Sequence, residues 1–172
     1  NKFNFFLSGN YNQSGGETNS ETFRQNKENG VVDNIFNQYS TNSRLRRFRS
    51  IRAGIDFFMD NPNTLSVTQG FVKGTFRNDE EQDQEFLNSG KTLERYGTRF
   101  SDGEAGFERY NTQFNYSHKF PEQGKELTAS VNYNYGKGEN NSDILNRFFN
   151  PDGTDASGSA RVRNAGSNNN NQ

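Results

Sequence analysis

Polar and apolar residues alternate along several stretches of the chain, most clearly in LTASVNYNYG, residues 127–136. Every second residue from Leu127 is apolar or aromatic, whereas the residues between them are small and polar. A period of two indicates a β-strand, because successive side chains point to opposite faces of a sheet. This stretch is therefore predicted to be a strand whose two faces meet different surroundings.

The same alternation predicts five strands, joined by segments of two very different lengths. The strands are expected at about 2–13, 44–59, 64–77, 105–120 and 125–136. Turn-forming residues, including Asn-Pro, give short connections at 60–63 and 121–125. The polar, Gly-, Asn- and Ser-rich tracts are predicted to be long loops, at 14–43, 78–104 and 137–172.

Two details of this pattern are less regular. Residues 31–39, inside the first polar tract, have enough apolar side chains to form a short helix or strand. In the predicted strand 64–77, Val72 and Phe76 fall on the face opposite Leu65, Val67 and Phe71. We therefore expect a β-bulge in this strand.

The alternation of short and long connections points to a membrane barrel. Compact soluble domains have a median connection of about 4–6 residues, whereas outer-membrane barrels combine short periplasmic turns with long external loops. The predicted fold class is all-β, a segment of an antiparallel up-and-down transmembrane β-barrel. The smallest such barrels have about 8 strands. We therefore expect residues 1–172 to be part of one larger barrel domain.

Composition agrees with strands that have one wet face. Only 28% of the 172 residues are hydrophobic and the mean hydropathy is -1.16, yet aromatic residues make up 14%. Disordered chains are usually poor in aromatic residues, so disorder is a weak interpretation. The net charge of -1 gives no reason to expect nucleic acid as a partner. The absence of cysteine excludes disulfides and thiolate metal sites in this chain, and no apolar run is long enough for a transmembrane helix.

Several segments resemble the barrel region of a known receptor family. They are NKFNFFLSGNYNQ, RAGIDFFMDNPNTLSV and YNTQFNYSHKFPEQGKELTASVNYNYG, together with the Asn-rich tracts. They are similar to outer-membrane TonB-dependent receptors of the Bacteroidetes group. The resemblance implies a bacterial outer membrane location and nutrient uptake. A plug domain and a TonB-contacting segment, both expected in that family, are absent from this stretch, so TonB is expected to act only through a plug domain elsewhere.

The densest charge cluster is RLRRFRSIR, residues 44–52. By alternation Arg44, Arg46 and Arg52 face the lumen, where they could attract an anionic substrate, pair with acidic residues of a plug, or simply line the wall. Arg47 and Arg49 fall on the lipid face and are expected at the outer rim, near lipopolysaccharide phosphates. A solvated strand extension above the membrane is the alternative interpretation.

Aromatic residues form two predicted groups. Phe57, Phe58, Tyr116 and Phe120 near the short turns, and Tyr11, Phe76, Tyr133 and Tyr135 near the long tracts, are expected to form the two aromatic girdles of a barrel. The aromatic residues of the long tracts are candidate contacts for a ligand, a surface lipoprotein or another subunit of a membrane complex, although they could instead pack on one another. The strongest of these candidates are Phe86, Tyr96, Phe100, Phe148 and Phe149.

No catalytic, cofactor or metal site is expected. His118 is the only histidine, and a single histidine without cysteine does not make a usual zinc site. The stretch NPDGTDASG, 150–158, lacks the spacing of a calcium loop. The sequence therefore predicts a transporter segment rather than an enzyme. A structural or docking barrel and a soluble β-module that binds glycans remain as alternatives.

Overall fold

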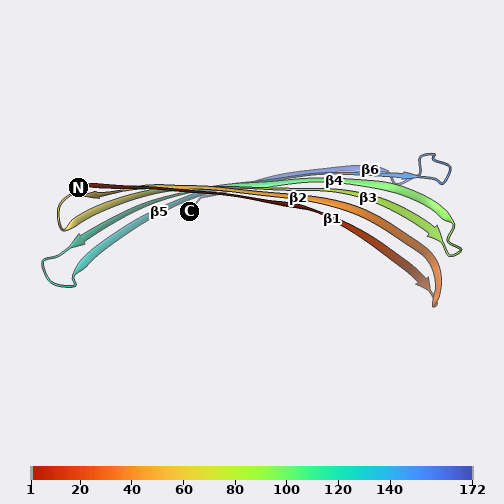
Figure 1. The fold of residues 1–172 in the computed structure, drawn as a ribbon, viewed down its shortest axis with the longest axis horizontal. Coiled ribbons are helices and arrows are strands. Elements are labelled where there is room, and N and C mark those ends of the chain that lie inside the picture. The colour runs from red at the N-terminus through yellow and green to blue at the C-terminus, as the bar shows by residue number, and fades with distance from the viewer. Residues whose placement is uncertain (1, 172) are drawn as a thin grey trace.

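Six long strands form one antiparallel sheet in the computed structural model, which describes residues 2–171. The strands follow one another in chain order, each paired with the next, as an up-and-down meander (Figure 1). The described residues contain no helix, and therefore no helix that could cross a membrane. The strands are β1 (Phe3–Glu28), β2 (Val31–Phe58), β3 (Asn63–Asn88), β4 (Leu93–Lys119), β5 (Glu126–Phe149) and β6 (Ala160–Asn171).

The three polar tracts predicted to be long loops are mostly strand, so that part of the prediction is wrong. Residues 14–43 and 78–104 form long hairpins, and 137–171 forms the end of β5, a turn and β6; Gln172, the last residue of that tract, lies outside the described residues. Residues 31–39 are strand as well. The tracts were missed because both of their faces are polar, so an extended backbone there leaves no alternation of hydrophobicity to detect.

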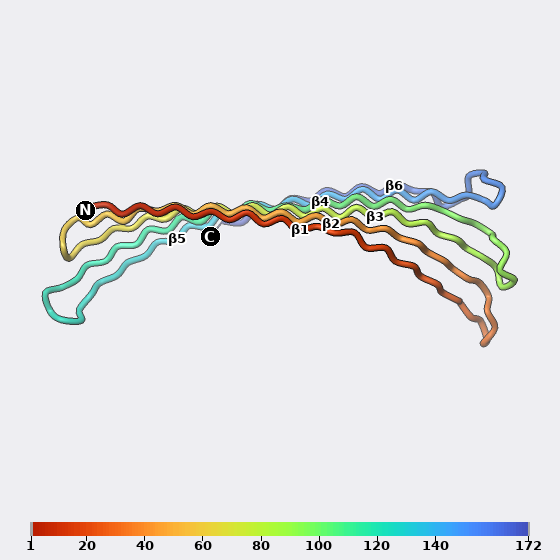
Figure 2. Tube along the Cα trace, in the orientation of Figure 1, coloured from red at the N-terminus to blue at the C-terminus, as the bar shows by residue number. Residues whose placement is uncertain are grey.

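Short connections, gathered at the two ends of the sheet, join the strands (Figure 2). The first connection consists of Asn29 and Gly30, which have φ of 50° and 84°. Positive φ at both central residues is the geometry of a type I′ hairpin turn, which matches the twist of the flanking strands. One end of the sheet carries the turns at 59–62 and 120–125, and the other carries those at 29–30, 89–92 and 150–159.

The predicted bulge in the third strand is absent from its expected place. The pairing of β3 runs without a shift through Val72 and Phe76. Shifts of register occur instead near the far turns, between Asn26 and Lys27 and between Phe86 and Leu87. Phe76 therefore projects from the opposite face to Phe71 because the strand is regular there.

The two faces of the sheet can be followed from strand to strand. Phe5 pairs with Ile55 on β2, which pairs with Val67 on β3. Val67 pairs with Phe114 on β4, so all these side chains project from one face, which we call face A. Outside the bulges, face A carries the odd-numbered residues of β1, β2, β3, β5 and β6 and the even-numbered residues of β4. Face B carries the alternate residues.

The sheet has almost no core. Ile35 is the one hydrophobic residue among those described that is buried, at 4% exposure. Both edges are open as well: β1 has a neighbour on one side only, and β6 pairs with residues 135–146 of β5, which leaves 126–134 unpaired on that side. Unpaired strand edges and uncovered apolar faces need either another protein surface that covers them or an environment other than water.

Candidate functional site

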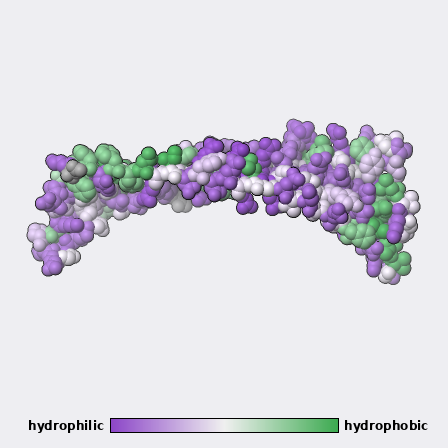
Figure 3. All heavy atoms as spheres, in the orientation of Figure 1, coloured by the Kyte–Doolittle hydropathy of each residue, from purple (hydrophilic) through white to green (hydrophobic). Residues whose placement is uncertain are grey.

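Face A carries a broad apolar surface close to the turns at 59–62 and 120–125. Many of its side chains are strongly exposed, with Leu7 at 77%, Phe5 at 72% and Val131 at 65%, and the others are half-buried. In Figure 3 it is the green area along the upper side of the sheet, at the end where the N-terminus lies. We call it the apolar band; it comprises Phe3, Phe5, Leu7, Ile51, Ala53, Ile55, Phe57, Leu65, Val67, Phe71, Tyr110, Phe114, Tyr116, Leu127, Ala129, Val131, Tyr133 and Tyr135.

Polar side chains inside and beside the apolar band hydrogen-bond to each other. The hydroxyl of Thr112 donates to Oε1 of Gln69 on the neighbouring strand, at 2.6 Å. At the turn side, the Tyr116 hydroxyl donates to Oδ1 of Asn63 at 2.6 Å, and Nδ1 of His118 lies 2.8 Å from the same oxygen. These polar groups therefore have hydrogen-bond partners within the sheet itself.

A row of charged residues borders the apolar band on the side away from the turns at 59–62 and 120–125. Arg49, Lys73, Glu108 and Lys137 are successive neighbours across β2, β3, β4 and β5. Nζ of Lys73 lies 2.7 Å from Glu108, and Nζ of Lys137 lies 3.6 Å from it. The Arg49 guanidinium lies 5.8 Å from the ring centroid of Tyr11 on β1. Beyond this row both faces of the sheet are polar along most of each strand.

Face B, behind the apolar band, is lined by small and amide side chains that hydrogen-bond across strands. Asp56 accepts hydrogen bonds from Asn4 (3.0 Å) and Ser66 (2.7 Å). The Asn111 amide donates to Asn134 at 2.6 Å. The chain therefore has an apolar and a polar surface back to back along the same stretch of strands.

The candidate arginines lie on the two faces as alternation predicts. Arg44, Arg46 and Arg52 project from face B, whereas Arg47 and Arg49 project from face A. Nε of Arg44 donates to Asn42 (2.8 Å) and Asn78 (3.2 Å), both on face B. Arg46 is exposed without a hydrogen bond among the described residues. The structure spreads these residues along β2 rather than gathering them at one point.

The five candidate aromatic residues lie in strands and separate into two groups. Phe86 and Phe148 are on face B, with ring centroids 6.0 Å apart. The guanidinium of Arg95 lies 4.4 Å from the centroid of Phe86 and 4.6 Å from that of Phe148. On face A, Tyr96 stacks on Phe149 at 5.4 Å, and Phe100 is exposed on the same face.

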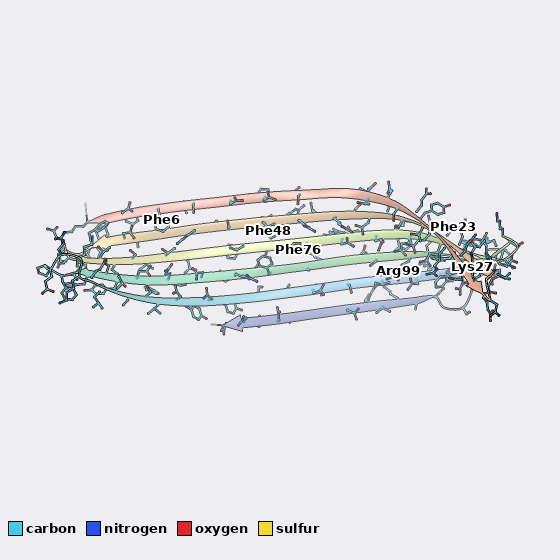
Figure 4. The ribbon with its side chains drawn as sticks, turned by 90° about the horizontal axis from the view of Figure 1, so that it is seen from below. Phe6, Phe23, Lys27, Phe48, Phe76 and Arg99 are labelled. Atoms are coloured by element: carbon cyan, nitrogen blue, oxygen red, sulfur yellow. The ribbon has the colours of Figure 1, made fainter. Side chains whose placement is uncertain are left out.

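The predicted aromatic girdles are only partly found on the apolar face. Phe57, Tyr116, Tyr11, Tyr133 and Tyr135 lie on face A. Phe76, however, lies on face B, where it meets Phe48 edge to face at 5.4 Å. Figure 4 shows Phe6, Phe48 and Phe76 placed along the sheet from the turn end toward its middle. Phe58 is the last residue of β2 and Phe120 lies in the turn after β4, so both are outside the apolar band.

Four arginines of face B were not singled out from the sequence: Arg24, Arg95, Arg99 and Arg109. Three of them lie in tracts interpreted as loops, where no face could be assigned. Counting alternate residues through 14–43 and 78–104 as if they were strands would have placed them. The fourth, Arg109, stands in a predicted strand, but its significance depends on neighbours that are distant in sequence.

Asp143 holds β6 to β5 through charged hydrogen bonds on face A. Arg161 donates to it from Nε (2.9 Å) and Nη2 (2.5 Å), and Arg163 donates from Nε (3.0 Å). The hydrogen bond from Arg161 is the main reason that the pKa of Asp143 is lowered from 3.8 to about 2. No cluster of His, Cys, Asp and Glu suited to a metal ion occurs among residues 2–171.

The stretch 150–158 forms a turn stabilised by its own side chains. Asp152 accepts hydrogen bonds from the hydroxyl (2.7 Å) and the amide (3.0 Å) of Thr154. These bonds lower the pKa of the Asp152 carboxyl. The carboxylate is thus engaged within the turn, as in an Asx turn.

The sequence matches no protein-family model, and no curated protein matches it significantly.

Proposed function

We propose that this chain is part of the wall of a bacterial outer-membrane β-barrel of the TonB-dependent receptor type, which takes up a nutrient across that membrane. The observation that carries the proposal is the apolar band: a wide, exposed apolar surface on face A, directly behind a hydrogen-bonded polar surface on face B. This is the arrangement expected of a wall between lipid and a hydrated lumen. The receptor type and the uptake function rest on the sequence resemblance.

The dimensions of the apolar band support a membrane location. On β5 the band runs from Leu127 to Tyr135, which at about 3.4 Å per residue is roughly 27 Å along the strand. With a tilt of about 35–45°, the band would be roughly 20 Å tall, near the ~25 Å belt of outer-membrane barrels. The row of Arg49, Lys73, Glu108 and Lys137 would then lie at headgroup level, where lipopolysaccharide phosphates could be met.

The strand extensions beyond that row would stand outside the cell. They are polar on both faces along most of their length and end in the turns at 29–30, 89–92 and 150–159. A hairpin that projects from a barrel rim is a suitable place for contact with a ligand or a surface lipoprotein. Phe86, Tyr96, Phe100, Phe148 and Phe149 would make such contacts from strands rather than from mobile loops.

Single cysteines along β5 test the membrane assignment, because the chain has no cysteine of its own. Spin labels would be placed at Ala129→Cys and Val131→Cys on face A, and at Ser130→Cys and Asn132→Cys on face B, in the full-length protein in outer membranes. Relaxation by oxygen, which partitions into lipid, should be strong at 129 and 131. Relaxation by a water-soluble nickel chelate should be strong at 130 and 132. Equal access of the chelate to all four positions would refute the proposal.

A further inference from the structure

The charges of the sheet are divided unequally between its two faces. Acidic residues dominate the extensions of face A, whereas only Asp56, Glu80 and Glu126 stand among the paired positions of face B. Two of these three are already engaged, Asp56 by Asn4 and Ser66, and Glu126 by Ser117. Face B carries seven strand arginines: Arg24, Arg44, Arg46, Arg52, Arg95, Arg99 and Arg109.

A groove of about 1030 Å³ crosses the sheet from β1 to β6, and most of the residues that line it belong to face B. We call it the arginine groove. Arg52 and Arg109 are its charged side chains on that face, and none of the described residues that line it is acidic. Gly70 and Gly136 have no side chains to fill it, and Asn111 contributes an amide at its surface.

The two guanidinium groups are held in place but keep their hydrogen-bonding capacity. Arg52 lies over the ring of Phe6, 5.9 Å from its centroid, and Arg109 lies over Phe107 at 5.2 Å. Neither makes a hydrogen bond or ion pair with any residue between 2 and 171. A guanidinium presents five N–H donors in a planar fork that matches carboxylate and phosphate groups.

The spacing of the two arginines sets the kind of ligand. Arg52 is on β2 and Arg109 on β4, so β3 runs between them with Gly70 directly beside Arg52. Two strand spacings separate the two backbones by roughly 9–10 Å. The guanidinium of Arg52 lies over Phe6 on β1, and that of Arg109 lies over Phe107 on its own strand, so each fork can take one anionic group of a ligand that spans the groove.

We propose that the arginine groove binds a ligand that carries carboxylate or phosphate groups, which Arg52 and Arg109 recognise through charge-assisted hydrogen bonds. This adds a ligand class to the proposed function, and it rests on that function only in taking face B as the inner wall of a barrel. The Asn111–Asn134 pair beside the arginines supplies neutral donors and acceptors for the rest of the ligand.

Equilibrium dialysis of the full-length protein in detergent tests the proposal, with ³²P-labelled phosphate and ¹⁴C-labelled succinate as separate probes and sodium chloride to match ionic strength. At least one probe should bind saturably, and the two arms distinguish phosphate from carboxylate. Arg52→Gln and Arg109→Gln should each weaken that binding by ~10-fold or more, because a hydrogen bond to a charged group is lost.

The matched control is Arg77→Gln. Arg77 is on β3, the strand between Arg52 and Arg109, but it projects from face A, where it pairs with Asp79. The control variant should bind the probes like the parent protein, and heat-modifiable gel mobility should show that all variants are folded. Binding that survives the double substitution R52Q/R109Q overturns the proposal. The absence of saturable binding in the folded parent protein also overturns the proposal. Acidic groups of the full-length protein that already pair with both arginines would give that result. Because the measurement is made in detergent, its outcome is independent of the lipid exposure tested by spin labels.

Discussion

At the residue scale, aromatic side chains of face B lie over glycines of neighbouring strands. A Cβ added to Gly54 would collide with the ring of Phe6, and one added to Gly74 would collide with Phe107. At Gly97 the added atom would come within 2.5 Å of Phe148. An aromatic ring that covers a glycine shields a weak point of a strand and is held flat against the sheet. This explains how large rings fit on the polar face B of the sheet.

Gly74→Ala should therefore destabilise the protein. The nearest atoms to the new methyl group all belong to the Phe107 ring, so this ring must turn away from Phe48 and Phe76, at a cost of about 1–3 kcal/mol for overpacking. Gly16→Ala is the matched control, because nothing lies within 4 Å of its added Cβ. The midpoint of urea unfolding in detergent should fall for Gly74→Ala and stay nearly constant for Gly16→Ala. Equal midpoints would mean that the packing of these rings does not require a glycine at position 74.

Neighbouring residues of β5 should respond very differently to arginine. Val131 is in the apolar band, so under the proposed membrane assignment Val131→Arg would place a charge in lipid, at a cost of roughly 2–4 kcal/mol near the midplane. Asn132 is on face B, where Asn132→Arg would remain hydrated. The heat-modifiable mobility of the Val131→Arg variant should be lost at a lower temperature than that of the parent. If both variants shift equally, the two faces have the same environment.

At the element scale, the sequence predicted those parts of the strands in which one face is apolar. Phe3, Phe5 and Leu7 mark face A of β1 because Asn4 and Ser8 interrupt them, and the structure confirms five of its six strands on such grounds. The extensions could not be predicted in this way, because Gln82, Asp83 and Gln84 are equally polar on either face. Pairing with strands that are distant in sequence keeps them extended, and hydrophobic periodicity carries no information about that pairing.

The candidate site, too, could be predicted from the sequence only in part. Alternation was sufficient to separate Arg44, Arg46 and Arg52 from Arg47 and Arg49, because these residues adjoin an apolar stretch of β2. The arginine groove could not be predicted, because it depends on Arg52 and Arg109 lying on opposite sides of β3. That neighbourhood follows from the register of three strands.

The attachment of β6 should withstand mild acid and weaken only below about pH 4. The folded state lowers the pKa of Asp143 from 3.8 to about 2, so the carboxylate stabilises the β5–β6 pairing at any pH above its unfolded value. The stabilisation is lost as the pH falls from about 4 through 2, when Asp143 is protonated. Hydrogen exchange of residues 160–171 should be unchanged, after correction for the intrinsic rate, between pH 7 and 5 and faster near pH 2.5. Asp143→Asn should exchange fast at every pH.

The two ends of the sheet should lie on opposite sides of the membrane. Gln123 is in a turn beside the apolar band, whereas Ser89 is in a turn at the far end of the extensions. In intact cells a membrane-impermeant maleimide should label Ser89→Cys, and it should label Gln123→Cys only after the outer membrane is permeabilised. Labelling of Gln123→Cys in intact cells would contradict the orientation.

At the scale of the whole molecule, each strand depends on its neighbours, and no part of 78–104 is a dispensable loop. These residues are the ends of β3 and β4, which pair with β2 on one side and β5 on the other. Replacing them with a flexible linker would leave residues 34–44 of β2 and 141–149 of β5 without partners on one side. Ligand contacts in this region are therefore better tested by single substitutions, such as Phe86→Ala or Phe100→Ala.

The sheet formed by the described residues, 2–171, should not be stable as a separate soluble protein. It is one layer thick, and Ile35 is the one buried hydrophobic residue among those described. Folding must offset about 1–2 kcal/mol of backbone entropy per residue, and apolar burial is the main term that does so. Here the apolar band stays exposed, and the unpaired edges at β1 and at 126–134 of β5 favour association with other chains.

Expressed alone and without detergent, the chain should aggregate or remain unfolded by circular dichroism and size-exclusion chromatography. With lipid or detergent and the remaining strands of a barrel, the same residues should become resistant to protease. A soluble monomer with a cooperative unfolding transition would instead favour the soluble glycan-binding β-module over the membrane barrel. In such a monomer the apolar band would have to be buried by other parts of the chain, which a single open sheet does not do.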